Sequence, residues 1–175
     1  GIESMVAGVS IKNCISYADL YVLKVADPMV TIGLAGGIVS EAMGGRISNC
    51  TSYSTITIGD NVGSCVFVGG IVGAQQDGST DNCHSYASIV VGDDAEFIMG
   101  FGGIAGTSEG GGCITNCFSS ATIVVGENYS SCEHIGGIVG HVEGGLISGN
   151  IAMNCIIPGI DDYAGAITGG PFNDV

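Results

Sequence analysis

Three acidic residues recur at one position of a repeating pattern and are candidate calcium ligands. Asp60, Asp93 and Glu127 each follow a β-branched run that ends in glycine, and Asp94 and Glu96 lie beside the second of them. Carboxylates stacked on neighbouring strands, about 4.8 Å apart, repel each other by about 1 kcal/mol even in water. Calcium would relieve this repulsion because it accepts several carboxylate oxygens. The alternative is that the side chains splay into water, where charge pairs contribute little energy.

Three tyrosines form a second candidate site. Tyr17, Tyr53 and Tyr86 each lie three residues after a repeating cysteine. The alternation of the surrounding residues directs them away from the core. Three rings on successive strands would form a strip with a flat apolar part and polar tips, a surface suited to a host glycan or protein. The alternative is a structural stack, because aromatic pairs across strands contribute about 0.2–1 kcal/mol without any ligand.

The sequence offers few histidines that could bind a metal ion or take part in catalysis. Glu133-His134 and His141-x-Glu143 lie close together in the sequence, but a metal site needs three or four converging ligands and supporting residues around them. We therefore expect two exposed loop histidines near acids. The His-Glu-x-x-His motif of zinc peptidases is absent. No catalytic residue is predicted, the chain is not expected to be an enzyme, and calcium is the only cofactor suggested.

Six of the eight cysteines fall at two recurring positions. One position holds Cys14, Cys50, Cys83 and Cys117, and the other holds Cys65 and Cys132. Equivalent residues of stacked parallel strands have roughly parallel Cα–Cβ bonds, which suits a disulfide poorly. We therefore expect buried free thiols that pack as small hydrophobic groups.

All these positions belong to one repeat. Gly36-Gly37-Ile38-Val39 returns in similar form at residues 69, 102 and 136, so the copies begin 33, 33 and 34 residues apart. A fixed period of this size is typical of repeat architectures. We expect one repeat domain over residues 1–175 with five approximate coils: 1–35, 36–68, 69–101, 102–135 and 136–175.

Each coil contains three short strand signals separated by turn residues, and no segment has helical periodicity. The third signal alternates with period two, which places Cys50, Ser52, Ser54, Ile56 and Ile58 on one face. The apolar end of this face assigns it to the core. Short strands whose equivalent residues stack on one another predict an all-β fold. We expect a right-handed parallel β-helix of about five coils with a ~33-residue repeat.

Asparagine recurs at a predicted corner of the first four coils. Asn13, Asn49, Asn82 and Asn116 would stack as a ladder in which the side-chain amides satisfy one another. Alternatively, asparagine stands there because it tolerates the backbone geometry of the turn. Both interpretations are structural, and both can hold.

Composition excludes several classes of function. The 175 residues have a net charge of −14, and the only cations are Lys12, Lys24 and Arg46. Nucleic acid binding needs clustered Lys and Arg, so it is not expected. No run of about 18 apolar residues occurs, so membrane insertion is not expected either. The glycine at position 1 suggests a fragment of a larger protein, whose neighbouring domains would then be partners.

The repeat resembles the GLUG motif family. Gly136-Gly137-Ile138-Val139-Gly140 and the stretch from Gly112 to Ile123 carry the resemblance best, and it extends over residues 36–150. GLUG repeats occur in large bacterial surface proteins, including proteins assigned as adhesins. The resemblance implies a non-catalytic module, extracellular or at the surface of a bacterium, that serves as an adhesin or stalk segment and binds or presents a host ligand.

The resemblance also leaves an alternative function open. GLUG repeats accompany the catalytic part of immunoglobulin-A-cleaving metallopeptidases, so the chain would then be an accessory region of a secreted enzyme. β-Helices also host polysaccharide-degrading enzymes, which need two positioned carboxylates, or calcium with a basic residue. The scarcity of cations and the absence of tryptophan argue against that activity in this chain.

Overall fold

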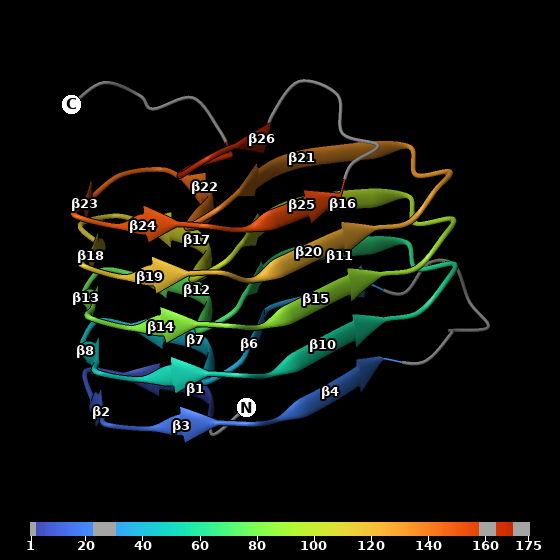
Figure 1. Ribbon diagram of the computed structural model, residues 1–175. Coiled ribbons are helices and arrows are strands. Elements are labelled where there is room, and N and C mark those ends of the chain that lie inside the picture. The colour runs from blue at the N-terminus through green and yellow to red at the C-terminus, as the bar shows by residue number, and fades with distance from the viewer. Residues whose placement is uncertain (1–2, 23–30, 158–163, 170–175) are drawn as a thin grey trace.

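The computed structural model describes residues 3–22, 31–157 and 164–169, and these consist of strands and turns without a helix. The strands form a solenoid in which each sheet is five or six strands deep, or about four complete turns. In Figure 1 the front strands β3 (Ile15–Ser16) and β4 (Asp19–Val22) run from left to right while the chain climbs from the N-terminal rung. The coil is therefore right-handed, as predicted.

Every complete coil contributes five strands, and all pairings between coils are parallel. The strands of the first rung, besides β3 and β4, are β1 (Glu3–Ala7), β2 (Ser10–Lys12), β5 (Thr31–Ile32) and β6 (Ala35–Gly36). The second coil has β7 (Val39–Met43), β8 (Arg46–Ser48), β9 (Thr51–Ser52), β10 (Thr55–Ile58) and β11 (Ser64–Gly69). The third has β12 (Val72–Gln76), β13 (Ser79–Asp81), β14 (His84–Ser85), β15 (Ser88–Val91) and β16 (Phe97–Gly102).

The fourth coil repeats this order with β17 (Ala105–Glu109), β18 (Cys113–Thr115), β19 (Phe118–Ser119), β20 (Thr122–Val125) and β21 (Ser131–Gly136). The last strands are β22 (Val139–Val142), β23 (Leu146–Ser148), β24 (Ile151–Ala152), β25 (Cys155–Ile157) and β26 (Ala164–Gly165). Stacked strands make five sheets, called A to E in chain order and represented in the third coil by β12 to β16. The register aligns Val39, Val72, Ala105 and Val139 in sheet A, which agrees with the spacing of the repeats.

The prediction of three strands per coil was wrong. Two expected strands are each divided in two: the one from Cys50 to Ile58, and the one around Gly36 to Ser40 that Cys65–Val68 was expected to feed in the next copy. The strand expected from Cys50 to Ile58 divides into β9 and β10. Inside it, Ser52 Oγ accepts a hydrogen bond from the backbone N–H of Ser54 at 3.3 Å, a local bond that bends the chain. The serines of the other coils make the same bond two residues ahead, as at Ser85 with Ala87.

The second break lies at the Gly-Gly pair and brings sheets A and E against sheet C. A β-carbon placed on Gly70 would lie 2.1 Å from Ser85 Oγ and 2.3 Å from the carbonyl oxygen of Gly103. Only glycine allows this approach. The contact lies between two apolar clusters, one around Ile71 and the cysteine column and one around Phe101. The glycine pair therefore narrows the interior at its middle.

The predicted core face is confirmed. Cys50, Ser52, Ser54, Ile56 and Ile58 are all buried, and so are their counterparts in the next two coils. The serines lie where the glycine pair approaches, and the aliphatic residues fill the wider part of the interior. Small polar residues therefore occupy the constriction because there is no room for larger ones.

Both interpretations of the corner asparagines hold. Asn13, Asn49, Asn82 and Asn116 all have a left-handed backbone, with φ between 49° and 56°, a conformation that asparagine tolerates better than most residues. Asn82 Nδ2 also donates to Asn49 Oδ1 at 2.7 Å, as a ladder requires. Asn116 instead donates to Asp81 Oδ1 at 3.1 Å. The amide ladder therefore spans one pair of coils, whereas the turn geometry recurs in all four.

Seven cysteines are free thiols in the described part of the chain: Cys14, Cys50, Cys65, Cys83, Cys113, Cys117 and Cys132. Each thiol of the recurring column donates to the carbonyl two residues before it, as Cys117 Sγ does to Thr115 O at 3.2 Å. Burial raises the pKa of Cys132 to about 11. Five of the seven thiols are buried, as expected, whereas Cys14 and Cys113 are half-buried. Buried, protonated thiols such as Cys132 react slowly, so Cys132 is a packing residue.

Asp81 joins three successive rungs and gives the fold a dependence on acid pH. It accepts hydrogen bonds from Asn116 Nδ2 at 3.1 Å, Arg46 Nη2 at 2.8 Å and Thr115 Oγ1 at 3.0 Å. The hydrogen bond from Asn116, followed by those from Arg46 and Thr115, lowers the pKa of Asp81 below its ordinary value of 3.8.

A carboxyl group with a lowered pKa stabilises the fold above its unfolded pKa, and the contribution is lost as pH falls through the folded value. We therefore expect the native protein to lose more unfolding free energy between pH 5 and pH 3 than Asp81→Asn does. Urea melts across this range measure the difference. Parallel pH profiles for the two proteins would contradict the assignment, because every other acidic residue is common to both.

Candidate functional site

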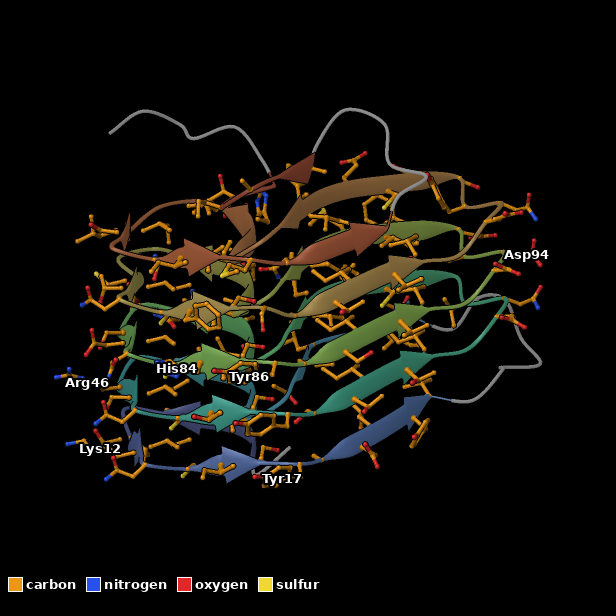
Figure 2. All side chains as sticks on the ribbon, in the orientation of Figure 1. Lys12, Tyr17, Arg46, His84, Tyr86 and Asp94 are labelled. Atoms are coloured by element: carbon orange, nitrogen blue, oxygen red, sulfur yellow. The ribbon has the colours of Figure 1, made fainter. Side chains whose placement is uncertain are left out.

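The predicted tyrosine strip is present as a continuous stack. The ring centroids of Tyr17 and Tyr53 lie 5.1 Å apart, those of Tyr53 and Tyr86 lie 5.0 Å apart, and each pair is inclined by only 8°. The rings project from the bend between sheets C and D, where Figure 2 labels Tyr17 and Tyr86 on the front of the molecule. Parallel register places one ring above the next, so the stack follows directly from the repeat.

Stacking determines which part of each ring is accessible. Tyr53 and Tyr86 are 45% and 41% exposed, because neighbouring rings cover their faces, whereas Tyr17 at the end of the stack is 72% exposed. Ring edges and hydroxyl groups therefore form most of the accessible surface. A ligand that lies along the solenoid axis meets a row of polar tips about one rung apart.

The residues beside the tyrosines were not predicted from the sequence. The Phe118 ring lies 5.8 Å from that of Tyr86, tilted by 51°, and 6.1 Å edge-on from that of His84, so it extends the aromatic surface from the neighbouring repeat position. Ile151 and Met153 are exposed on the last rung of the same face. Alignment of the five coils, rather than of the tyrosines alone, would have found this second column.

We call these two outward columns together the sheet C face. Its members are Ile15, Thr51, His84, Phe118 and Ile151 in one column, and Tyr17, Tyr53, Tyr86, Ser120 and Met153 in the other. None of the ten is acidic, although the chain carries a net charge of −14. The sheet C face is therefore an apolar and aromatic area on an otherwise acidic protein.

The acidic column has an arrangement that neither expectation described. Asp60 Oδ1 accepts the backbone N–H of Asp93 at 3.2 Å, and Asp93 Oδ1 accepts that of Glu127 at 2.8 Å. Each carboxylate thus binds the amide of the next rung. Figure 2 shows the adjacent Asp94 at the end of the cross-section opposite Arg46. The described residues contain no group of three or more His, Cys, Asp or Glu side chains arranged to hold a metal ion.

Calcium binding by this column remains a prediction. If Asp60, Asp93 and Glu127 bind calcium, millimolar calcium should raise the melting temperature of the native protein, and Asp93→Asn should reduce that rise. The asparagine retains an oxygen that accepts the Glu127 amide, so the two proteins should melt alike in a calcium chelator. An unchanged melting temperature in calcium would leave the carboxylates as turn-stabilising groups only.

The two histidines beside glutamates are not the exposed loop residues that we expected. His134 belongs to β21 and His141 to β22, and their side chains are only 14% and 19% exposed. The two strands meet at the Gly-Gly corner, which brings His134 Nδ1 to 3.4 Å from His141 Nδ1. That prediction was wrong because the corner is formed by contacts between coils, which the local sequence does not reveal.

Carboxylates and an aromatic ring surround this histidine pair. His141 Nε2 lies 3.2 Å from Glu143 Oε1, and His134 Nε2 lies 3.8 Å from Glu133 Oε2. The Phe67 ring is stacked near the His141 ring, with centroids 6.5 Å apart. Burial, followed by the neighbouring His141, lowers the pKa of His134. The lowered pKa favours the neutral form of the His134 imidazole.

These observations define the class of the protein as an all-β, right-handed parallel β-solenoid with an exposed aromatic stack. The described residues include no helix that is long and apolar enough to cross a membrane. No protein-family model, curated protein or solved structure matches the chain.

Proposed function

We propose that the chain is a non-catalytic module of a larger bacterial surface protein, an adhesin or stalk segment, and that the sheet C face contacts a host glycan or protein. The observation that carries the proposal is the continuous stack of Tyr17, Tyr53 and Tyr86, extended by Phe118, on a face without acidic residues. Exposed apolar patches bordered by polar surface are typical of interaction sites.

The chemistry of the face favours binding. Tyrosine supplies a large apolar contact and a hydroxyl group that can hydrogen-bond at its edge. The rings are already held by their neighbours, so little side-chain entropy is lost when a ligand orders them. The face carries no carboxylate that a ligand would have to desolvate. These properties support a neutral, hydroxyl-rich glycan or an uncharged protein surface as the ligand.

The repeat supports the proposed setting. A parallel solenoid is extended and holds equivalent side chains at a constant spacing, which suits a rigid stalk that presents a surface along its length. The resemblance of the coils to GLUG repeats supports a place outside the cell, at a bacterial surface. The acidic remainder of the chain favours solubility and does not favour anionic partners.

The double variant Tyr53→Ala, Tyr86→Ala tests the binding face. We expect at least a tenfold loss of binding to host cells or to an immobilised glycan panel, because central aromatic residues contribute most to such contacts. The melting temperature should fall only slightly, since each stacked pair contributes about 0.2–1 kcal/mol. Circular dichroism establishes that the variant retains its β structure.

Tyr21→Ala is the matched control. Tyr21 is 59% exposed and lies on β4 of sheet D, outside the stack. Its removal deletes one exposed tyrosine but leaves the sheet C face intact, so binding should be unchanged. Full binding by the folded double variant would exclude this face as the contact surface.

A further inference from the structure

The distance between His134 and His141 matches the spacing of two ligands on one metal ion. Their Nδ1 atoms are 3.4 Å apart. In a tetrahedral zinc site with bonds of 2.0–2.1 Å, two nitrogen ligands lie about 3.4 Å apart. The pair thus has the required separation without any movement of the backbone. The two imidazoles come from strands on either side of the Gly-Gly corner, so the fold sets this distance.

The outer nitrogens have the neighbours that metal-binding histidines normally have. A ligating histidine usually donates its second ring N–H to a carboxylate, which fixes the ring and raises its basicity. Here Glu143 Oε1 lies 3.2 Å from His141 Nε2, and Glu133 Oε2 lies 3.8 Å from His134 Nε2. Both carboxylates lie on the Nε2 side of the rings, while the two Nδ1 atoms lie 3.4 Å from each other.

Each neutral imidazole has a tautomer that leaves a lone pair on Nδ1. When His141 Nε2–H donates to Glu143, His141 Nδ1 presents a lone pair, and His134 Nδ1–H donates to it. A metal ion between the rings needs lone pairs on both Nδ1 atoms. His134 reaches that state when its proton moves through solvent from Nδ1 to Nε2, beside Glu133. No net proton is released, and the Nε2–H then lies on the side of Glu133, whose Oε2 is 3.8 Å away.

The surroundings hold the rings and favour a cation. Phe67 is stacked beside His141, and the residue between Phe67 and His134 in their column is Gly100, which leaves room for the Phe67 ring. Thr107, paired in register with His141 one rung below, is fully buried, and its Oγ1 has no hydrogen-bond partner in the described structure. The net charge of −14 raises the local concentration of cations.

We propose that His134 and His141 bind a divalent transition metal ion through their Nδ1 atoms, with Glu133 and Glu143 as orienting residues. Imidazole nitrogens suit Zn²⁺, Ni²⁺ and Cu²⁺, whereas calcium requires oxygen ligands. The described residues supply no third protein ligand, so water or a group from a bound partner completes the coordination. The site is separate from the sheet C face and from the acidic column.

Zinc titration calorimetry on the full chain tests this site. We expect one zinc ion per chain, unaffected by millimolar calcium. His134→Asn and His141→Ala should each weaken zinc binding at least tenfold. Asparagine at position 134 tolerates the left-handed backbone there, where φ is 58°. Glu143→Gln should weaken binding by about tenfold, because it disturbs only the orienting bond.

Glu109→Gln is the matched control, since Glu109 occupies the position equivalent to Glu143 one rung below. It removes the same charge and should leave zinc affinity unchanged. His84 remains in every variant and reports the binding of a lone imidazole. Equal zinc affinity in the native protein and in His141→Ala, or equal losses in Glu143→Gln and Glu109→Gln, would overturn the assignment. Because Glu143 is exposed, that second comparison does not depend on how well the histidine variants fold.

Discussion

Gly70→Ala is expected to destabilise the solenoid by about 3 kcal/mol or more, the upper end of what overpacking costs. The added β-carbon would lie 2.1 Å from Ser85 Oγ and 2.3 Å from the carbonyl oxygen of Gly103. A side chain can rotate away, but the carbonyl belongs to the equivalent corner of the next coil. Relief of the second contact therefore requires the stacked coils to separate. Urea denaturation followed by circular dichroism measures the loss.

Gly33→Ala is the control for this substitution. A β-carbon at Gly33 meets no atom of the described residues within 4 Å, so alanine there should be neutral or stabilising by about 0.4–1 kcal/mol through the unfolded chain. Adding Ser85→Ala to Gly70→Ala removes the hydroxyl but not the carbonyl, so it should restore only part of the stability. Equal stability of the two glycine variants would disprove the tight corner.

The sequence was sufficient to predict the fold because its main signals are local. Period-two alternation between Cys50 and Ile58 identified the buried face, and the 33-residue spacing identified the stacking. Parallel stacking then places like residues on like, which is why the Tyr17, Tyr53 and Tyr86 stack followed from their positions. These features need no knowledge of which distant residues touch.

The breaks in the strands could not be predicted because they depend on contacts across the interior. Gly70 is tight against Ser85, which comes from the opposite sheet of the same coil, and against Gly103 of the next coil. The sequence shows a Gly-Gly pair but not what it touches. The bend at Ser52 has a local cause, a hydrogen bond two residues ahead, and serine at this recurring position was an available signal.

In the candidate sites, too, the features that depend on contacts between coils could not be predicted from the sequence. Phe118 was missed because it belongs to the column beside the tyrosines and reaches Tyr86 only through its ring orientation. His134 and His141 were assigned to exposed loops because their closeness depends on the Gly-Gly corner. In the acidic column, the hydrogen bond of Asp60 to the Asp93 amide depends on the register between coils, so neither expectation for these carboxylates described it.

Phe101→Ala is expected to destabilise the protein by about 3–5 kcal/mol, the usual loss when a fully buried phenylalanine is truncated. Phe101 is fully buried and is the largest side chain in the interior of the described structure. Its neighbours in register, Val68 and Ile135, belong to the coils below and above, so the ring contacts three successive coils. A cavity there loosens the central coil on both sides, and coils of a solenoid are stable only against their neighbours.

Phe97→Ala is the control, because it also removes a phenyl ring but from a position that is less buried. Phe97 lies in the same strand, β16, but is only half-buried, so its truncation should cost no more than about 1 kcal/mol. Phe101→Leu retains most of the buried volume and should lose less than about 1.5 kcal/mol. Urea melts of the three variants measure these losses at unchanged net charge. If Phe97→Ala were as destabilising as Phe101→Ala, the apolar column through sheet E would not be the main source of stability in the central coils.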